Sequence, residues 1–296
     1  MWGTFESLTV ARAGVRLHTR VGGEGPPLLL LHGHPQSMAM WHRVAPTLAQ
    51  SHRVVLMDLR GYGDSARPAA DPAHANHSKR EMALDALAVM AAHGFDRFDV
   101  LAHDRGARVA HRLAADAPEA VGRLLLLDIA PTLAMYTHTS EAFARAYWHW
   151  FFMIQPGPLP EALIASDPAL YVRSVMGGRH AGLAPFAPDV LAEYERCAAI
   201  PGTAASIAED YRASASIDLE HDRADVAAGR RLTQPLRVLW GEHGAVGRCF
   251  DVLGLWRERA AQVTGRALPC GHYLAEEAPQ QVLAEAQAFF RDSTLD

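Results

Sequence analysis

The chain has 296 residues, of which 49% are hydrophobic and 21% charged, and its net charge is −5. That length and composition fit one globular α/β domain with a sizeable insertion, and the lack of any basic run argues against nucleic acid as a partner. The three cysteines are odd in number and lack Cys-x-x-Cys spacing, so neither a disulfide framework nor a metal site is predicted.

Short apolar runs alternate with helical stretches in the first part of the chain. Runs without polar alternation are typical of strands buried on both faces of a parallel sheet. We expect strands at residues 8–21 (a pair), 28–31, 54–57, 98–102 and 124–129. We expect helices at residues 40–48, 78–93 and 105–116.

The middle of the chain differs from both ends. Between about residues 133 and 233 it is alanine-rich, aromatic and broken by prolines, whereas strands return at 236–240 and 266–268 before a last helix at 278–291. Strand–helix alternation on both sides of a helical segment predicts an α/β fold with an inserted cap. We therefore expect a core domain made of residues 1–132 and 234–296, and a helical cap domain made of residues 133–233.

Targeting features are lacking in the sequence. Residues 1–7 do not show the charged start and apolar core of a signal peptide. No apolar run approaches the roughly 20 residues of a membrane helix. We therefore expect a cytoplasmic protein without a membrane partner.

Asp104 follows the strand expected at residues 98–102. It lies in Ala102-His103-Asp104-Arg105-Gly106, just before a helical stretch, which is the strand–turn–helix pattern that presents a nucleophile. A carboxylate in this position can attack a saturated carbon and form an ester that water then cleaves. Taken alone, Asp104 is equally well explained as a helix N-cap.

Asp128 and His272 complete a possible catalytic set. Asp128 follows the apolar run 124–127, and His272 lies in a turn just after the last expected strand. Each is thus at the C-terminal end of a strand, and the order nucleophile, acid, histidine is the one that a strand–turn–helix nucleophile scaffold requires. Asp128 alone could be a turn residue, and His272 is one of sixteen histidines. The combination favours catalysis, with Asp128 as the orienting acid and Glu242 as the alternative.

Backbone N–H groups next to the nucleophile are candidates for an oxyanion hole. By position these are the amides of Arg105, directly after Asp104, and of His34, after the His32-Gly33 turn. His32 itself is better explained as a residue that stabilises the turn than as a second base.

Arg105 and Arg108 indicate the class of substrate. Residues three apart on a helix share a face, and two guanidinium groups at the positive end of that helix favour a small carboxylate. The alternative for each arginine is a salt bridge to the cap.

At this point the chain resembles a known family, the fluoroacetate dehalogenases of the α/β-hydrolase superfamily. The resemblance is carried by His32-Gly33-His34-Pro35, His103-Asp104-Arg105-Gly106-Ala107-Arg108, Leu127-Asp128-Ile129-Ala130-Pro131-Thr132, Tyr147-Trp148-His149-Trp150, Glu209-Asp210-Tyr211-Arg212 and Gly271-His272. It implies a mostly parallel eight-stranded sheet with a helical cap, a homodimer and no cofactor. It also implies hydrolysis of small 2-haloacids, with fluoroacetate giving glycolate and fluoride through an aspartyl ester.

The same resemblance places a carboxylate clamp at Arg105 and Arg108, and a halide pocket at His149, Trp150 and Tyr211. The three pocket side chains offer N–H and O–H donors for a departing halide. Adjacent helical residues point in different directions, so His149 and Trp150 must reach the halide from two flanks of one helix.

Other activities remain open from the sequence. An epoxide hydrolase uses the same aspartate, histidine and acid, but a neutral epoxide has no need for paired arginines. A haloalkane dehalogenase is disfavoured for the same reason, and the intact catalytic set argues against a non-catalytic ligand receptor. A haloacetate dehalogenase with weak activity on C–F bonds also fits.

Overall fold

The computed structural model describes residues 2–291. Eight strands of these residues form one sheet in the order β1-β2-β4-β3-β5-β6-β7-β8. The strands are β1 (Glu6–Arg12), β2 (Val15–Gly22), β3 (Pro27–Leu31), β4 (Arg53–Met57), β5 (Phe98–His103), β6 (Val121–Leu127), β7 (Leu236–Gly241) and β8 (Val263–Leu268). β1 and β2 pair in antiparallel fashion at one edge, and the other strands are parallel to one another. The predicted mostly parallel, eight-stranded α/β sheet is therefore confirmed.

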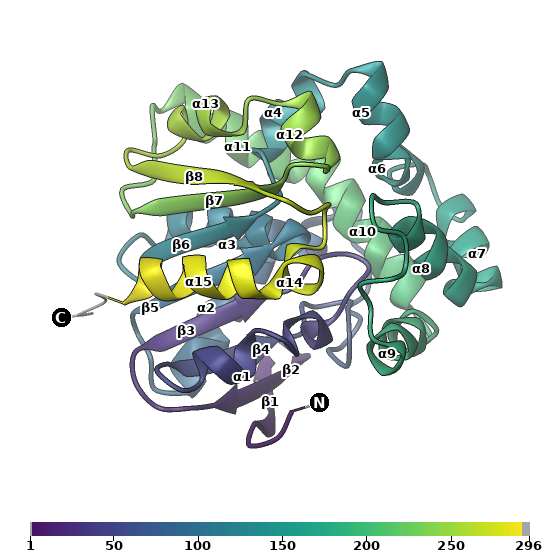
Figure 1. Ribbon diagram of the computed structural model, residues 1–296. Coiled ribbons are helices and arrows are strands. Elements are labelled where there is room, and N and C mark those ends of the chain that lie inside the picture. Colours follow the sequence, from purple (N-terminus) through teal and green to yellow (C-terminus); the bar gives the residue numbers. More distant parts are fainter. Residues whose placement is uncertain (1, 292–296) are drawn as a thin grey trace.

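Helices cover both faces of this sheet (Figure 1). In the core they are η1 (Met38–Trp41), α1 (Ala45–Leu48), η2 (Ala75–His77), α2 (Lys79–Ala92), α3 (Asp104–Asp116), α12 (Ala245–Cys249), α13 (Val252–Arg257), α14 (Leu274–Glu277) and α15 (Pro279–Phe290). Between β6 and β7 they are α4 (Thr132–Thr137), α5 (Glu141–Ala146), α6 (Trp148–Met153), α7 (Leu159–Ser166), α8 (Pro168–Gly177), α9 (Pro188–Ala198), α10 (Thr203–Ala215) and α11 (Ile217–Ala227).

The leucine run of β3 explains why both faces of the sheet are covered. Leu29 and Leu31 belong to a buried core shared with α2 and α3, whereas Leu28 and Leu30 belong to a second core shared with α1 and α15. Successive side chains of a strand point to opposite faces, so one continuous apolar run packs against two helical layers. Each fully buried leucine contributes about 1.5–3 kcal/mol.

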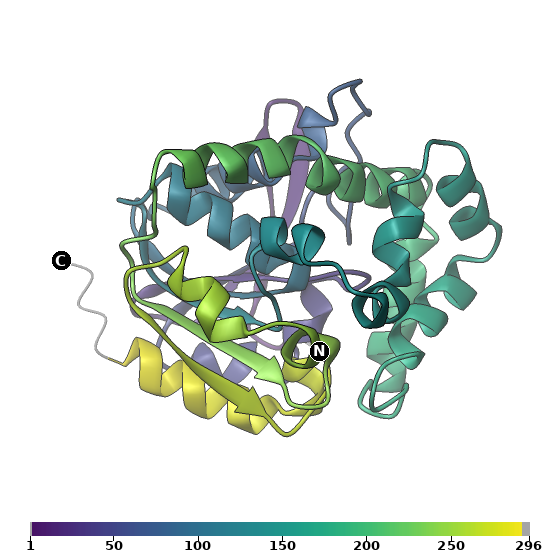
Figure 2. The same cartoon turned by 90° about the horizontal axis from the view of Figure 1, so that it is seen from above.

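The cap helices gather at one end of the sheet. Figure 1 places α5 to α10 together there, and Figure 2 shows the same group along one side of the molecule. α11 returns to the core, because Arg112 of α3 pairs with Asp222 and Asp225 of α11 at 3.0 and 2.7 Å. Within residues 2–291 no helix combines the length and the apolar character needed to cross a bilayer.

Two predicted elements differ from the structure. The helix expected at residues 40–48 is two short pieces, η1 and α1, separated by a turn; Pro46 lies in the first turn of α1, where a missing backbone N–H costs nothing. The last strand is longer than residues 266–268, because β8 begins at Val263 and includes Gly265. Gly265 has a positive φ of 157°, and a glycine within a strand weakens the apolar pattern by which strands are recognised.

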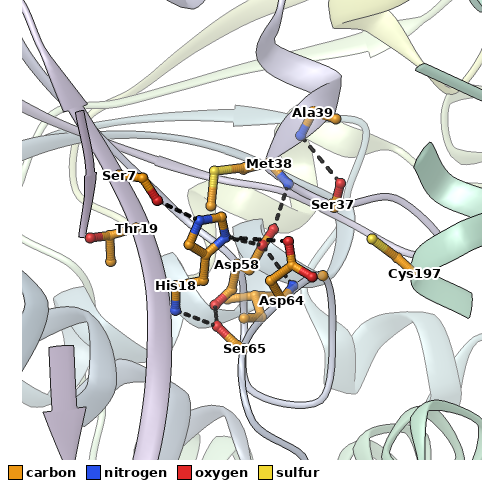
Figure 3. A network of polar contacts seen from close by, with 12 residues as sticks. Ser7, His18, Thr19, Ser37, Met38, Ala39, Asp58, Asp64, Ser65 and Cys197 are labelled. Atoms are coloured by element: carbon orange, nitrogen blue, oxygen red, sulfur yellow. Dashed lines mark hydrogen bonds and ion pairs between the residues drawn. The ribbon is translucent and has the colours of Figure 1, made fainter. Parts of the chain in front are cut away.

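A polar network joins β2 to the loop after β4 (Figure 3). Ligand atoms of His18, Asp58 and Asp64 lie within 4.8 Å of one another, as in a metal site. However, Asp58 already accepts hydrogen bonds from the Met38 N–H at 2.8 Å and the Asp64 N–H at 3.0 Å, and its Oδ2 lies 3.0 Å from His18 Nδ1. Asp64 pairs with Arg196 of α9 at 2.9 Å. These contacts use the oxygen lone pairs, so we interpret the network as a structural hub.

Asp58→Asn is expected to lower the free energy of unfolding at pH 7 by about 1–3 kcal/mol, because buried donors lose a charged acceptor. Burial alone would raise the pKa of Asp58, but His18, His32 and the amides of Met38 and Asp64 together hold that pKa below its usual value. The pKa of aspartate in an unfolded chain is about 3.9. A lower pKa in the folded protein stabilises the fold at pH values above about 3.9, and this stabilisation is lost as the pH falls through the folded-state pKa.

Denaturant unfolding at pH 7 and at pH 3 measures this effect. The difference between the wild type and Asp58→Asn should be larger at pH 7 than at pH 3. Asp96→Asn is the matched control, because Asp96 is exposed. An equal difference at both pH values would contradict the assigned role of the Asp58 charge.

Candidate active site

A sharp turn between β5 and α3 presents Asp104. Its φ is +45°, in the left-handed region that is costly for most side chains but tolerated by aspartate. The turn is packed closely: a Cβ at Gly106 would meet His32 O at 2.4 Å, and a Cβ at Gly33 would meet Asp104 Cβ at 2.5 Å. Both positions therefore require glycine. Backbone strain of this kind is concentrated at functional sites, which favours the nucleophile interpretation over a simple helix cap.

His272 and Asp128 are in direct contact. His272 Nδ1 lies 2.5 Å from Asp128 Oδ2, and the Gly241 N–H donates to Asp128 Oδ1 at 2.9 Å. This arrangement fixes the imidazole so that Nε2 is available as a base. Glu242, the alternative acid, is exposed. The geometry thus brings His272 together with Asp128 and leaves Glu242 outside the pair.

The surroundings of Asp104 keep it ionised. Burial alone would raise the pKa of this carboxyl, but the nearby His272, His103, Arg108 and Arg105 lower that pKa well below its usual value. An ionised carboxylate at neutral pH is the form that a nucleophile needs.

One predicted oxyanion-hole amide contacts the nucleophile. The His34 N–H donates to Asp104 Oδ1 at 2.9 Å. Arg105 is the second residue of α3, where backbone N–H groups have no partner within the helix. His32 lies in the turn: the Leu59 N–H donates to its Nε2 at 3.0 Å, and its Nδ1 lies 2.9 Å from Gly33 O. This geometry supports the turn-stabilising interpretation of His32.

Arg105 forms a salt bridge to the cap, which was the alternative to substrate binding in the sequence analysis. Its Nε and Nη2 donate to the Asp210 carboxylate of α10 at 2.9 and 2.7 Å, and Nη2 also donates to Ser214 Oγ at 2.6 Å. Its Nη1 is buried and has no hydrogen-bond partner among the described residues. The guanidinium lies 4.0 Å from the ring centroid of Tyr211. Arg105 therefore keeps one free donor while its charge is largely balanced by Asp210.

Arg108 has a different environment. It is buried, and its Nη1 donates to Ala130 O at 3.2 Å and to Thr132 Oγ1 at 2.9 Å. Within residues 2–291 no carboxylate lies within ion-pair distance of its guanidinium, and its Nε has no partner. Burial lowers the pKa of Arg108, yet an arginine remains charged in a protein. A buried guanidinium without a counter-ion is costly unless an anion binds there.

The three predicted halide-pocket residues meet at the buried end of the cap. The Tyr211 ring centroid lies 6.0 Å from that of His149 and 6.2 Å from that of Trp150. His149 and Trp150 are adjacent in α6 and therefore point in different directions, yet both rings lie near the Tyr211 ring. In the part of the chain that the structure describes, Trp150 Nε1 and the Tyr211 hydroxyl are buried without a hydrogen-bond partner.

All three side chains of this cluster lie close to groups around Asp104. The His34 ring lies 6.1 Å from the His149 ring and 5.4 Å from the Tyr211 ring, and Arg108 lies 4.6 Å from the Trp150 ring centroid. Burial keeps the pKa of His149 well below its usual value, so its ring is neutral near pH 7. It can then offer one N–H donor without a positive charge.

Sequence reasoning missed a buried hub at Asp210. Its carboxylate accepts hydrogen bonds from Arg105 and from the Tyr62 hydroxyl at 2.7 Å, and it also pairs with Lys79, the only lysine of the chain. Burial alone would raise the pKa of Asp210, but Arg105 and Lys79 lower it well below its usual value. Asp210 was part of the segment that carried the resemblance, and its position beside Tyr211 was the available signal.

His103 was also missed. Its Nε2 lies 2.9 Å from the carbonyl oxygen of His272, and the two rings lie 4.7 Å apart. Burial lowers the pKa of His103 to about 3, so its ring is neutral near pH 7. Its contacts with His272 join the His272 turn to the turn that carries Asp104.

Comparisons with known proteins show which family the chain resembles as a whole. A family model described as "alpha/beta hydrolase fold" matches residues 26–279. The chain is 40% identical over 294 residues to a fluoroacetate dehalogenase from Burkholderia sp., covering 99% of this chain and 96% of that relative. It is also 35% identical over 285 residues to a soluble epoxide hydrolase from Corynebacterium sp. (strain C12), covering 94% of each. A solved putative alpha/beta hydrolase from Nostoc sp. PCC 7120 superposes with a TM-score of 0.96 at 50% identity, over 99% of this chain and 100% of that one.

Proposed function

The chain belongs to the α/β-hydrolase fold family, and from the chemistry around Asp104 we propose that it hydrolyses small 2-haloacids, converting fluoroacetate into glycolate and fluoride. One observation carries the proposal: Arg108 is buried beside the charge of Asp104, but no described carboxylate lies within ion-pair distance of its guanidinium. A substrate carboxylate supplies the missing negative charge. A neutral substrate leaves the guanidinium unpaired.

The first step forms an ester on the enzyme. Arg108 and the free Nη1 of Arg105 hold the substrate carboxylate, so that an Asp104 oxygen faces the carbon that bears the halogen. The oxygen forms a bond to this carbon while the carbon–halogen bond breaks, and the bonding electrons leave with the halide. Holding both groups in line supplies a large part of the rate.

The departing halide meets the free donors of the cap. Trp150 Nε1 and the Tyr211 hydroxyl are buried without partners in residues 2–291, and His149 adds a neutral imidazole. Burial raises the pKa of Tyr211 well above its usual value, so its O–H remains a donor. Fluoride is a poor leaving group unless it is hydrogen-bonded as it departs, and preorganised donors in a dry site supply that stabilisation.

The second step cleaves the ester. His272, oriented by Asp128 at 2.5 Å, takes a proton from a water molecule that attacks the carbonyl carbon of Asp104. The His34 N–H, already 2.9 Å from Asp104 Oδ1, stabilises the oxyanion together with the amide of Arg105. Collapse of this intermediate releases glycolate and restores the Asp104 carboxylate, and one proton is released overall.

Epoxide hydrolysis is the second candidate function. It is favoured by the 35% identical soluble epoxide hydrolase and by the free Tyr211 hydroxyl, which could polarise an epoxide oxygen. Fluoride and chloride electrodes with fluoroacetate and chloroacetate, run beside a diol assay with styrene oxide, separate the two. Diol formation without halide release from any haloacetate would overturn the proposal, whereas chloride release without fluoride release would restrict it to weaker carbon–halogen bonds.

Arg108→Gln is expected to lower kcat/KM for haloacetates by about 10- to 150-fold, because a charge-assisted hydrogen bond contributes roughly 1.5–3 kcal/mol. Arg108→Lys should retain part of the activity, since lysine keeps the charge and loses the planar fork. Halide release at several substrate concentrations measures the effect. Arg145→Gln is the matched control, because Arg145 is an exposed cap arginine. A comparable loss with neutral chloroacetamide would contradict a role in carboxylate binding.

A further inference from the structure

A cavity of about 280 Å³ lies beside His272, between the cap and the core. It is lined by cationic and imidazole side chains from four places in the chain, which we call the basic port: Arg179, His180, His243, Arg248 and His272. No aspartate or glutamate is among the described residues that line the cavity. The port therefore offers positive charge to an anion.

Arg179 stands out within this port. It follows α8 in the cap and is half-buried, but none of the carboxylates in residues 2–291 lies within ion-pair distance of it. Its Nη1 donates to Ala146 O at 3.3 Å, which is a neutral acceptor. Arg12 and Arg60, by contrast, pair with Glu81 and Asp85. Arg179 thus resembles Arg108 in lacking a counter-ion.

Tyr147 connects Arg179 to the catalytic groups. The guanidinium of Arg179 lies 4.5 Å from the ring centroid of Tyr147. The same ring lies 6.1 Å from that of His272 and 5.5 Å from that of His149. Tyr147 therefore lies close to Arg179, to the proposed base and to one residue of the proposed halide pocket.

Another part of the cavity lining is formed where the cap meets the core. The rings of His180, from the cap, and His243, from the loop after β7, stack at 4.3 Å. Arg248 lies on α12, is exposed, and also has no ion-pair partner in the described part of the chain. A water molecule takes up about 30 Å³, so the cavity has room for a two-carbon acid and part of its hydration shell.

We propose that the basic port is the entrance through which anionic substrate reaches the active site, with Arg179 as the residue that binds the carboxylate before it passes to Arg108. This inference rests on the proposed function. Arg179 acts in substrate capture, and Arg248 adds a weaker, solvent-screened attraction at the outer side. Charge lining a cleft raises the local concentration of an oppositely charged ligand.

A purely structural role for Arg179 makes different predictions. Its contacts with Ala146 O and the Tyr147 ring could hold the cap in place. Loss of such a support would lower kcat through Tyr147 and would affect neutral and anionic ligands alike. Loss of a capture site would instead weaken the binding of anions and leave kcat nearly unchanged.

The test compares Arg179→Gln, Arg179→Lys, Arg248→Gln and the Arg179→Gln/Arg248→Gln double variant with the wild type. Arg173→Gln is the matched control, because Arg173 lies on α8, is exposed and pairs with Glu195. The readouts are kcat and KM for chloroacetate, competitive inhibition by glycolate, and calorimetric binding of glycolate without turnover.

Arg179→Gln should raise the chloroacetate KM and the glycolate dissociation constant together by roughly tenfold, as expected for one charge-assisted contact. The lysine variant should restore most of that loss, and kcat should change by no more than about threefold. Unchanged glycolate binding in the double variant would overturn the inference, as would a fall in kcat alone without rescue by lysine. Wild-type protein that binds glycolate through Arg179 but releases no halide would instead overturn the proposed function.

Discussion

Asp104→Ala is expected to abolish halide release, with a loss on the order of 10⁴-fold or more, because no other carboxylate of residues 2–291 is placed to carry the covalent step. Asp210 is fully engaged by Arg105 and Lys79, and Asp128 is held by His272 and by the Gly241 N–H. Neither can take over the attack. The measurement is fluoride and chloride release under saturating substrate, with the detection limit set by a blank without enzyme.

Asp104→Asn is the control for folding in this experiment. Asparagine tolerates the left-handed backbone at φ +45° and keeps an oxygen for the His34 N–H, whereas its amide is not a useful nucleophile. Both variants should lose activity, and Asp104→Asn should keep the denaturant midpoint of the wild type more closely than Asp104→Ala.

Heavy-oxygen water tests the same step without any mutation. In a single turnover the new oxygen of glycolate comes from Asp104, and the oxygen of water enters the Asp104 carboxylate. Mass spectrometry of the peptide that contains Asp104 should show the label first. Label in the glycolate of the first turnover would mean that water attacks the substrate carbon directly, and the ester scheme would then be wrong.

The position of the candidate catalytic edge could be predicted from the sequence because each of its parts follows a strand of the parallel part of the sheet. Asp104 follows β5, Asp128 follows β6 and His272 comes shortly after β8. The carboxyl ends of parallel strands meet at one edge of a sheet, so strand order alone places these side chains near one another. The contact between His272 and Asp128 is the structural result that this reasoning anticipated.

The charge balance around the two arginines could not be predicted in the same way. Asp210 lies 105 residues after Arg105 and reaches it only through the packing of α10 against the core. No local sequence pattern predicts whether a buried arginine forms an ion pair with a carboxylate of its own chain. Only the structure separates Arg105, which is paired, from Arg108, which is not. Arg179 was overlooked for a related reason, because it lies in a cap loop with no periodic pattern.

The difference between Arg105 and Arg108 bears on substrate choice. Asp210 holds the guanidinium of Arg105 over the Tyr211 ring and leaves Nη1 free. Arg105 can then orient a carboxylate through a fixed donor, while Arg108 supplies most of the uncompensated charge. In the proposed reaction one bound monocarboxylate would neutralise Arg108 and satisfy buried donors that otherwise have no partner among the described residues, and this is the reason for proposing a small haloacid rather than a neutral epoxide as the substrate.

His272→Asn is expected to stop the reaction after the first step and to trap the ester. Asparagine cannot act as the base, and a positioned general base typically contributes 10²- to 10⁴-fold to such a step. His272 takes no proton in the first step. It helps to lower the pKa of Asp104, but His103, Arg108 and Arg105 lower that pKa as well, so the Asp104 carboxylate should remain a nucleophile in the variant. Halide should therefore be released in a burst of about one equivalent per active site, followed by a slow phase.

Intact-protein mass spectrometry of His272→Asn after incubation with chloroacetate should show the mass of one added carboxymethyl group, and peptide mapping should place it on Asp104. His138→Asn is the matched control, because His138 is an exposed cap histidine; it should turn over normally and carry no adduct. Asp128→Asn should also slow the second step, since Asp128 orients the imidazole at 2.5 Å. Continued halide release without any adduct would show that another group activates the water that cleaves the ester. If neither burst nor adduct formed, His272 would be needed before the carbon–halogen bond breaks, and the two-step assignment of Asp104 and His272 would fail.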